Sequence, residues 1–516
     1  GIRNVVIGTD AGTELTTGDS NVAIGWEALK NEDAHGNNTA IGTSALATLN
    51  AGADSYNTAV GYQAGASVST GIQNTLLGGL AGDVLSDADY NVAVGVSALG
   101  TDTKGSKSVA VGYSTLTAQN FTSSTDTYNT AVGYGAGVSV TTGQYNTLIG
   151  GEAGDALTTG NQNVAVGYNA LTADTLGDRN VAIGVSTLTA QNFTTTTDSY
   201  NTAVGALAGT AVTTGTQNTL IGGLAGDAIT TSNYTVAVGY NAAGSSTTGH
   251  SNSVLGRQAL YSNTTGSNNV AVGRDALEAN TTADDNTAVG FHSLVTNTTG
   301  AGNTAVGKFS LRYNTTAADN TAVGYQALTT NTTAANNTAM GVSALKLTTT
   351  GADNSAFGRG ALLANTTGAN NVAVGKSALV ANTTADDNTA VGTEALDANT
   401  TGNNLVAVGS NALGANTTAA NNVAVGSNAL GVNTTGANNS SVGTNSLDAN
   451  TTGASNTALG YRALSANTTA DSNTAIGRDA LLANTTGANN VAIGNEAMAA
   501  NTTGLQNVAL GDATLD

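Results

Sequence analysis

Residues 448–464 read DANTTGASNTALGYRAL, and residues 465–481, which follow without a gap, read SANTTADSNTAIGRDAL. The two blocks share an N-T-T segment, an N-T-A core that ends on glycine, and an A-L pair, all at the same spacing. A fixed period of this kind indicates a structural unit that stacks on copies of itself. The extent of the 17-residue repeat along the chain therefore decides the fold.

The glycine that ends the N-T-A core is called the anchor, and positions in the repeat are counted from it. From Gly256 to Gly511 an anchor recurs every 17 residues, and the earlier anchors begin at Gly8. Three of the earlier intervals are longer, one of 19 residues and two of 21, and the register returns after each. These 30 anchors predict a solenoid of about 30 coils.

The first part of the chain carries a second, longer period. G-G-x-A-G-D segments recur every 72 residues at 78–83, 150–155 and 222–227. We therefore predict two regions, a solenoid with loop insertions and this super-repeat over residues 1–239, and a uniform 17-residue solenoid over residues 240–516.

The period also indicates the class of solenoid. Helical repeats need roughly 33 residues or more for a helix pair, so 17 residues are too few. The N-T-A-V-G stretch suits a short strand, the A-L pair a second strand, and N-T-T-G a turn. The expected fold class is all-β, a parallel β-solenoid of the β-roll or β-helix type whose coils are joined by backbone hydrogen bonds.

The apolar positions predict what lies inside each coil. Position −1 is apolar in all 30 coils, mostly Val or Ile, and position +4 is Leu in nearly every coil from Gly256 onward. We expect both to fill the interior, each contributing roughly 1.5–3 kcal/mol. The alanine at −2 and the anchor would then share the outer face. A small apolar outer face implies a second backbone against it, so we expect a homo-oligomer, most simply a trimer.

Position −4 is Asn in 27 of the 30 coils. At the spacing of neighbouring strands these amides would hydrogen-bond along the solenoid as a ladder. The alternative is a row of ligand-binding amides. The ladder is exemplified by Asn269, Asn286, Asn303 and Asn320.

Charge and composition exclude several classes of function. The chain has 14 basic and 34 acidic residues, a formal net charge of −20, which excludes a basic nucleic-acid-binding stripe. It has no Cys, so it forms no disulfide or thiolate metal site. No apolar run approaches the roughly 18 residues of a membrane helix, so we expect no membrane insertion.

The chain starts at Gly1 without a signal peptide, and we expect further sequence or end-to-end stacking into filaments at its uncapped ends.

No reaction can be read from the sequence. His35, His250 and His292 stand far apart and in different coil positions, which favours surface residues over a metal site or catalytic triad. The pairs Asp284–Asp285 and Asp386–Asp387 lack the glycine pattern of calcium-binding rolls, although weak Ca²⁺ binding is an alternative. The G-G-x-A-G-D segments lack the G-K-[ST] of a phosphate loop. We assign no catalytic, cofactor-binding or metal-binding residue. We expect that the chain needs no cofactor and is not an enzyme.

The N-T-T segments have two interpretations. They recur in 14 of the 15 turns from Asn263 to Asn501, and each is formally an N-glycosylation sequon. The other interpretation, which we favour, is that Asn and Thr are turn residues of the coil.

The N-V-A-I-G segments at 21–25, 180–184 and 490–494 resemble the S-V-A-I-G repeats in the heads of trimeric autotransporter adhesins. The N-T-A-V-G…A-L…N-T-T-G arrays are similar to those of bacteriophage tail fibres. The resemblance covers the whole chain on about five residues per coil. It implies a left-handed parallel β-roll assembled as a trimer, although the 17-residue period is longer than that of the adhesin heads.

These observations favour a structural fibre or adhesin shaft, the rigid rod of a phage tail fibre or bacterial surface appendage, located outside the cell, on its surface or on a virion. Two alternatives stay open. Threonine columns at strand spacing would suit an ice-binding solenoid, and a β-helix would suit polysaccharide processing, although no cluster of carboxylates or basic residues supports the latter.

The two 21-residue intervals are the candidates for recognition. Residues 117–128 and 189–200 each add four residues and a phenylalanine. We expect the extra residues to bulge outward, where aromatic side chains would stack on glycans of a host surface. The alternative, which we favour, is that the loops pack back on the roll. The candidate recognition residues are Phe121, Tyr128, Phe193 and Tyr200.

Overall fold

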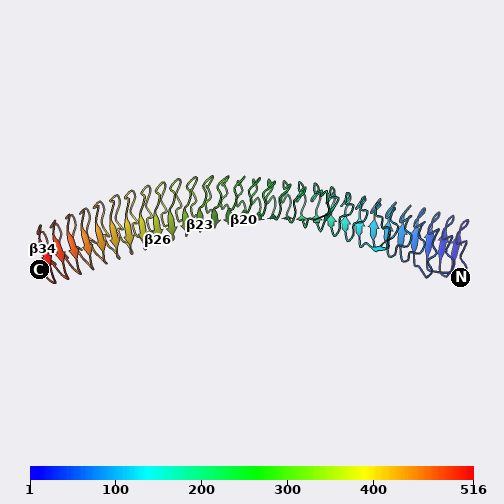
Figure 1. Ribbon diagram of the computed structural model, residues 1–516, viewed down its shortest axis with the longest axis horizontal. Coiled ribbons are helices and arrows are strands. Elements are labelled where there is room, and N and C mark those ends of the chain that lie inside the picture. Colours follow the sequence, from blue (N-terminus) through cyan, green and yellow to red (C-terminus); the bar gives the residue numbers. More distant parts are fainter. Residues whose placement is uncertain (516) are drawn as a thin grey trace. The chain divides into compact units, whose positions relative to one another are not determined.

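The computed structural model describes residues 1–515 and contains strands and turns but no helix in that range. The chain divides into two compact units, Gly1–Thr265 and the residues from Gly266 onward. Each unit is a stack of coils, with one short strand per coil lying beside the strand of the next (Figure 1). The predicted fold class is confirmed: a parallel β-solenoid of about 30 coils with a 17-residue period.

The first unit contains fifteen three-residue strands, one per coil, which pair in parallel. Their bounds are β1 (Val5–Ile7), β2 (Val22–Ile24), β3 (Thr39–Ile41), β4 (Thr58–Val60), β5 (Thr75–Leu77), β6 (Val92–Val94), β8 (Val109–Val111), β10 (Thr130–Val132), β11 (Thr147–Ile149), β12 (Val164–Val166), β14 (Val181–Ile183), β16 (Thr202–Val204), β17 (Thr219–Ile221), β18 (Val236–Val238) and β19 (Ser253–Leu255). Four shorter strands, described below, belong to the two long insertions.

The second unit contributes fifteen more. They are β20 (Val270–Val272), β21 (Thr287–Val289), β22 (Thr304–Val306), β23 (Thr321–Val323), β24 (Thr338–Met340), β25 (Ser355–Phe357), β26 (Val372–Val374), β27 (Thr389–Val391), β28 (Val406–Val408), β29 (Val423–Val425), β30 (Ser440–Val442), β31 (Thr457–Leu459), β32 (Thr474–Ile476), β33 (Val491–Ile493) and β34 (Val508–Leu510).

Neighbouring strands pair in parallel and in a single register. Each residue lies opposite the residue at the same position of the next coil, as Thr287 lies opposite Thr304. The backbone N–H of Thr287 donates to Asn303 O at 2.8 Å, and the N–H of Gly290 donates to Val272 O at 2.7 Å. A strand such as β21 is thus bonded to the coils before and after it and could not satisfy its backbone alone.

The second strand predicted for the A-L pair is wrong. Residues at +2 and +4 adopt left-handed backbone angles, with φ of 58° at Asp275 and 52° at Leu277, so the chain bends there instead of extending. The bend still joins neighbouring coils, because Leu277 N–H donates to Ser293 O at 3.1 Å. Coils are therefore hydrogen-bonded outside the strand as well as within it.

The interior prediction is right at +4 and wrong at −1. The leucines at +4, such as Leu277 and Leu328, are fully buried. On the strand, however, it is the alanine at −2 that is fully buried, as at Ala288, while Val289 at −1 is only half-buried and Met340 at the same position is 42% exposed. The outer strand face carries positions −3 and −1, so the small apolar outer face that suggested a close trimer contact does not exist.

The size of the side chain at +4 explains why alanine faces inward. Leucine replaces alanine at −2 in three coils, and glycine then stands at +4 of the same coil: the pairs are Leu76 with Gly82, Leu148 with Gly154, and Leu220 with Gly226. A Cβ built on Gly154 would lie 2.7 Å from Leu148 Cδ2. Positions −2 and +4 thus share one space, and a large residue at one requires a small residue at the other.

The anchor glycine is required by its backbone and by its neighbour. The anchors have φ between 126° and 144°, a region that L-residues with a side chain rarely adopt. A Cβ on Gly375 would also lie 2.4 Å from the carbonyl oxygen of Gly392, the anchor of the next coil. Glycine at the anchor is therefore what lets successive coils approach at strand spacing.

Substituting an anchor should open the stack locally. Gly78→Ala places a Cβ 2.5 Å from Gly95 O at a φ of 138°, and we expect it to cost roughly 1–3 kcal/mol from backbone strain alone. Hydrogen–deuterium exchange of β5 and β6 should then be faster than in the wild type. Gly79→Ala is the matched control, because the nearest atom to its Cβ would be 4.0 Å away. Equal exchange in the two variants would contradict this account of the anchor.

Candidate functional site: buried asparagine ladders and insertion loops

The asparagines at −4 form a continuous buried column. Asn269, Asn286, Asn303 and Asn320 are each fully buried. Each amide oxygen accepts a backbone N–H of the next coil: Asn286 N–H donates to Asn269 Oδ1 at 3.0 Å, and Asn303 N–H donates to Asn286 Oδ1 at 2.9 Å. The side-chain Nδ2 of Asn269 donates across the coil to Ala283 O at 2.9 Å. Both ends of the amide are used within the protein, which leaves no group free for a ligand.

A second asparagine ladder, not anticipated as such, is formed by the N-T-T segments at position +7. Asn416 Nδ2 donates to Asn399 Oδ1 at 3.0 Å in the preceding coil and to Ala419 O at 3.1 Å in its own. The asparagines of these segments from Asn263 to Asn484 are fully buried, so a glycan cannot be attached to them in the folded coil, whereas Asn501 is half-buried. The sequence does contain the pattern of this ladder, an asparagine at the same position of successive coils. Because asparagine is also a common turn residue, the pattern was interpreted as a turn.

The two threonines of each N-T-T segment have different roles. Thr383 Oγ1 donates to Thr400 O at 3.1 Å in the next coil, and Thr400 Oγ1 repeats this bond to Thr417 O at 3.0 Å. The following residue, as at Thr384 and Thr401, is exposed. In these coils the first threonine is half-buried and the second is exposed to solvent.

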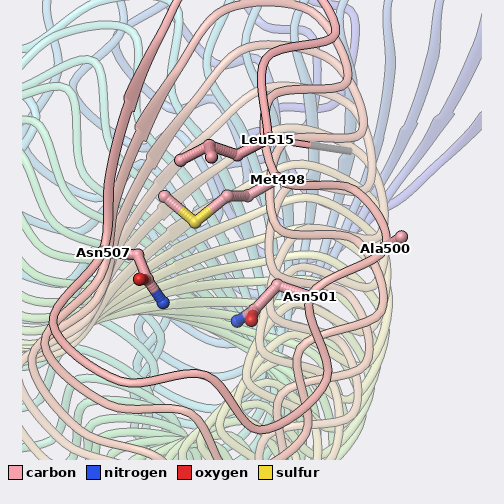
Figure 2. A pocket seen from close by; sticks show the side chains of 5 residues that line it. All are labelled: Met498, Ala500, Asn501, Asn507 and Leu515. Carbon is pink, nitrogen blue, oxygen red and sulfur yellow. The ribbon is translucent and has the colours of Figure 1, made fainter.

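The cross-section of a coil is visible at the C-terminal end of the described chain (Figure 2). Asn507 at −4 and Asn501 at +7 point into the interior toward one another, and Met498 and Leu515, both at +4, lie together beside them. The hollow that these side chains line is the interior of a coil rather than a separate binding site.

The two long insertions are tied to the roll. In each, a two-residue strand of the insertion pairs in parallel with the preceding coil: β9 (Thr125–Asp126) with β7 (Gly105–Ser106), and β15 (Thr197–Asp198) with β13 (Gly177–Asp178). Phe121 and Phe193 are 6% and 5% exposed. The phenylalanines thus pack back on the roll, as the favoured alternative predicts. The expectation that the extra residues bulge outward is wrong for them, because burying a large ring is more favourable than exposing it.

A buried polar network lies under each insertion and was not predicted. Gln119 Nε2 donates to Asp102 Oδ2 at 2.6 Å, and Asn129 Nδ2 donates to Gln119 Oε1 at 2.9 Å. The second insertion repeats it with Gln191 Nε2 donating to Asp174 Oδ2 at 2.6 Å. Burial raises the pKa of Asp174, and the hydrogen bond from Gln191 opposes that rise. The glutamine thus compensates a carboxylate taken out of water.

Tyr128 and Tyr200, the other two candidate recognition residues, are 47% and 50% exposed. Lys107 Nζ lies 5.1 Å from the centroid of the Tyr128 ring, and the Arg179 guanidinium lies 5.4 Å from that of Tyr200. The structure thus keeps the tyrosines at the surface, each beside a cation, and separates them from the buried phenylalanines.

These tyrosines belong to two exposed aromatic columns in the first unit, at positions −5 and +1, on either side of the outer strand face. The side chains are between 47% and 63% exposed. Some stack on one another, as Tyr113 does on Tyr134 with ring centroids 5.5 Å apart. The columns are Tyr56, Tyr90, Tyr128, Tyr145, Tyr200 and Tyr234 at −5, and Trp26, Tyr62, Tyr113, Tyr134, Tyr168 and Tyr240 at +1.

The remaining titratable candidates lie in separate surroundings. His250 Nδ1 accepts the N–H of Asn233 at 3.0 Å. His292 Nε2 lies 3.1 Å from Asp275 Oδ2, and its ring stacks on Phe291. Of the aspartate pairs, Asp386 Oδ1 accepts the backbone N–H of Ala369 at 2.7 Å and so acts within the fold.

Comparisons with known proteins add no family. No protein-family model matches the chain, and no curated protein sequence matches it significantly. Among residues 1–515 there is also no helix long and apolar enough to cross a membrane.

Removing the glutamine of one network should destabilise the chain in a pH-dependent way. Gln191→Leu leaves Asp174 Oδ2 with only the long 3.5 Å contact from Asn180 Nδ2, which should cost roughly 1–3 kcal/mol near pH 7. The loss of a bond to the charged form raises the pKa of the folded carboxyl further. Its ionisation therefore opposes folding above the unfolded pKa of about 3.9, and protonation removes the penalty as the pH falls.

Thermal unfolding followed by circular dichroism at pH 7 and pH 4 measures this difference. The midpoint of Gln191→Leu should lie below that of the wild type at pH 7 and approach it at pH 4. Gln217→Leu is the control, because Gln217 is exposed and should show no such dependence. A deficit that is the same at both pH values would show that the carboxylate is not its cause.

Proposed function

We propose that the chain is the shaft of an extracellular structural fibre, of the kind found in phage tail fibres or bacterial surface appendages. The observation that carries the proposal is that strands, bends and both asparagine ladders are all hydrogen-bonded to the adjacent coil, in the same register from coil to coil. A repetitive β-solenoid built this way fits a structural role, because each coil is stabilised by its neighbours and length is gained by adding coils. We propose no catalytic function for it.

We further propose that the shaft assembles with copies of itself as a homotrimer. The outer strand face supports this, since its −1 residues are apolar and partly exposed in coil after coil, including Ile149, Ile183 and Ile221 at 39%, 37% and 38%. The aromatic columns border this face in the first unit. Apolar side chains such as these isoleucines are typical of the buried core of protein interfaces.

Attachment to surface glycans is the proposed role of the exposed tyrosines on the insertions. About half of each side chain, 47% for Tyr128 and 50% for Tyr200, is exposed, and Lys107 and Arg179 lie over the rings. An exposed ring with a cation beside it suits the apolar patches and hydroxyls of a sugar. The buried phenylalanines position the loops and do not contact the ligand.

Antibody labelling tests the extracellular role. Antibodies raised against the full chain should label the surface of intact cells or virus particles of the source under the electron microscope. Labelling only after permeabilisation would overturn the proposal.

The glycan role is tested by a binding assay, in which Tyr128→Ala/Tyr200→Ala should bind immobilised host glycans less than the wild type. Tyr62→Ala/Tyr168→Ala, which removes two equally exposed rings outside the insertions, should bind normally.

Self-association is tested by light scattering on the purified chain. A trimer should have three times the chain mass of 50.3 kDa. Ile183→Glu/Ile221→Glu, which places two charges on the outer strand face, should shift the mass toward one chain. Thr384→Glu, at an exposed site away from this face, should leave the mass unchanged. A monomeric wild type would exclude the trimer.

A further inference from the structure

One coil position carries a buried acid in three coils of the first unit. Seven residues after the anchors Gly25, Gly95 and Gly167 stand Glu32, Asp102 and Asp174, all fully buried. In the two later coils the carboxylate is compensated. Asp102 accepts Gln119 Nε2 on one oxygen and the N–H groups of Gly105 and Phe121 on the other, and Asp174 has the same kinds of partner.

The first of these coils lacks that compensation. The residue 17 positions after Glu32 is Leu49, where the later coils have glutamine, and the residue 17 positions before it is Leu15. Glu32 Oε1 accepts the N–H of His35 at 3.1 Å, but Oε2 is buried and has no hydrogen-bond partner within residues 1–515. A buried carboxylate oxygen without a partner is costly, so it requires an explanation.

A histidine stands beside this carboxylate in the first coil only. His35 occupies the position of Gly105 and Gly177 in the other two coils, where a Cβ would lie 2.2 and 2.1 Å from the aspartate Oδ2. Its Nδ1 is buried and, in the described chain, makes no hydrogen bond. It lies 3.4 Å from Glu32 Oε1, longer than a good hydrogen bond.

Asp33 completes a cluster of three. One ligand atom from each of Glu32, Asp33 and His35 lies within 4.8 Å of the other two. Ligands bound at about 2.1 Å to a tetrahedral Zn²⁺ are roughly 3.4 Å apart, the separation already present between Glu32 Oε1 and His35 Nδ1.

We propose that Glu32, Asp33 and His35 form a site for a divalent transition metal of the Zn²⁺ type, with water as the fourth ligand. The donor set is one imidazole nitrogen and two carboxylates, which suits Zn²⁺ and related ions, whereas Ca²⁺ and Mg²⁺ take oxygen ligands. The ion replaces the glutamine donor of the later coils, neutralises the buried Glu32 and pins the E-D-A-H turn (residues 32–35) to its coil. The site is independent of the proposed fibre function.

Isothermal titration of the full, tag-free chain with Zn²⁺ tests the site. We expect one ion per chain. His35→Gly, which installs the residue of the equivalent coils, should weaken binding at least ten-fold. Leu49→Gln keeps all three ligands but offers Glu32 the amide donor found in the later coils, and should weaken binding by a smaller factor. His292→Ala, which removes a histidine beside Asp275, should bind like the wild type.

Absorption of the Co²⁺-loaded chain gives a second readout that does not depend on affinity. Tetrahedral coordination by nitrogen and oxygen should give visible bands that His35→Gly lacks, with circular dichroism confirming that the variant is folded. Absence of Zn²⁺ binding by the wild type, or binding that His292→Ala removes and His35→Gly preserves, would overturn the proposal.

Discussion

The close approach of one anchor glycine to the next is the constraint on which the rest of the structure depends. Gly375 and Gly392 show it: a single methyl group at the first would collide with the carbonyl of the second. Once the anchors are in contact, the strand before them and the bend after them fall into register with the adjacent coil. Backbone hydrogen bonds then follow throughout the coil, in segments that are not strands as well as in those that are.

The interior of each coil combines a very small apolar core with a polar one. In the second unit, alanine from the strand and leucine from the bend fill one side of most coils, and two asparagines fill the other. A coil this narrow cannot bury enough apolar surface to form alone. The ladders offset that deficit, because each amide satisfies a backbone group of its own coil and a group of the adjacent one. The stability of the array is therefore as much a matter of hydrogen-bond satisfaction as of hydrophobic burial.

The sequence was sufficient to predict the period, the parallel stacking and the burial of leucine at +4, because each follows directly from the recurrence of residues. It was not sufficient to decide which strand face is inside. Alternation shows that Ala288 and Val289 point in opposite directions, but the choice between them depends on how far Leu294 reaches across the coil, a tertiary property. The Glu32 cluster was not predictable for a related reason, since burial of Glu32 and the lack of a partner for its Oε2 are properties of the folded coil.

The near-identity of successive coils has a consequence for folding. In the second unit most ladder positions hold the same residue in every coil, so a chain mispaired by one whole coil would keep almost all of its native bonds. Such a slip would be separated from the native state by little energy, and frustration of this kind slows repeat proteins. The insertions remove that ambiguity in the first unit. Gln119 and Gln191 can donate to Asp102 and Asp174 only when each glutamine's coil stacks on the coil 17 residues before it. The insertions therefore fix the register of coils that would otherwise be interchangeable.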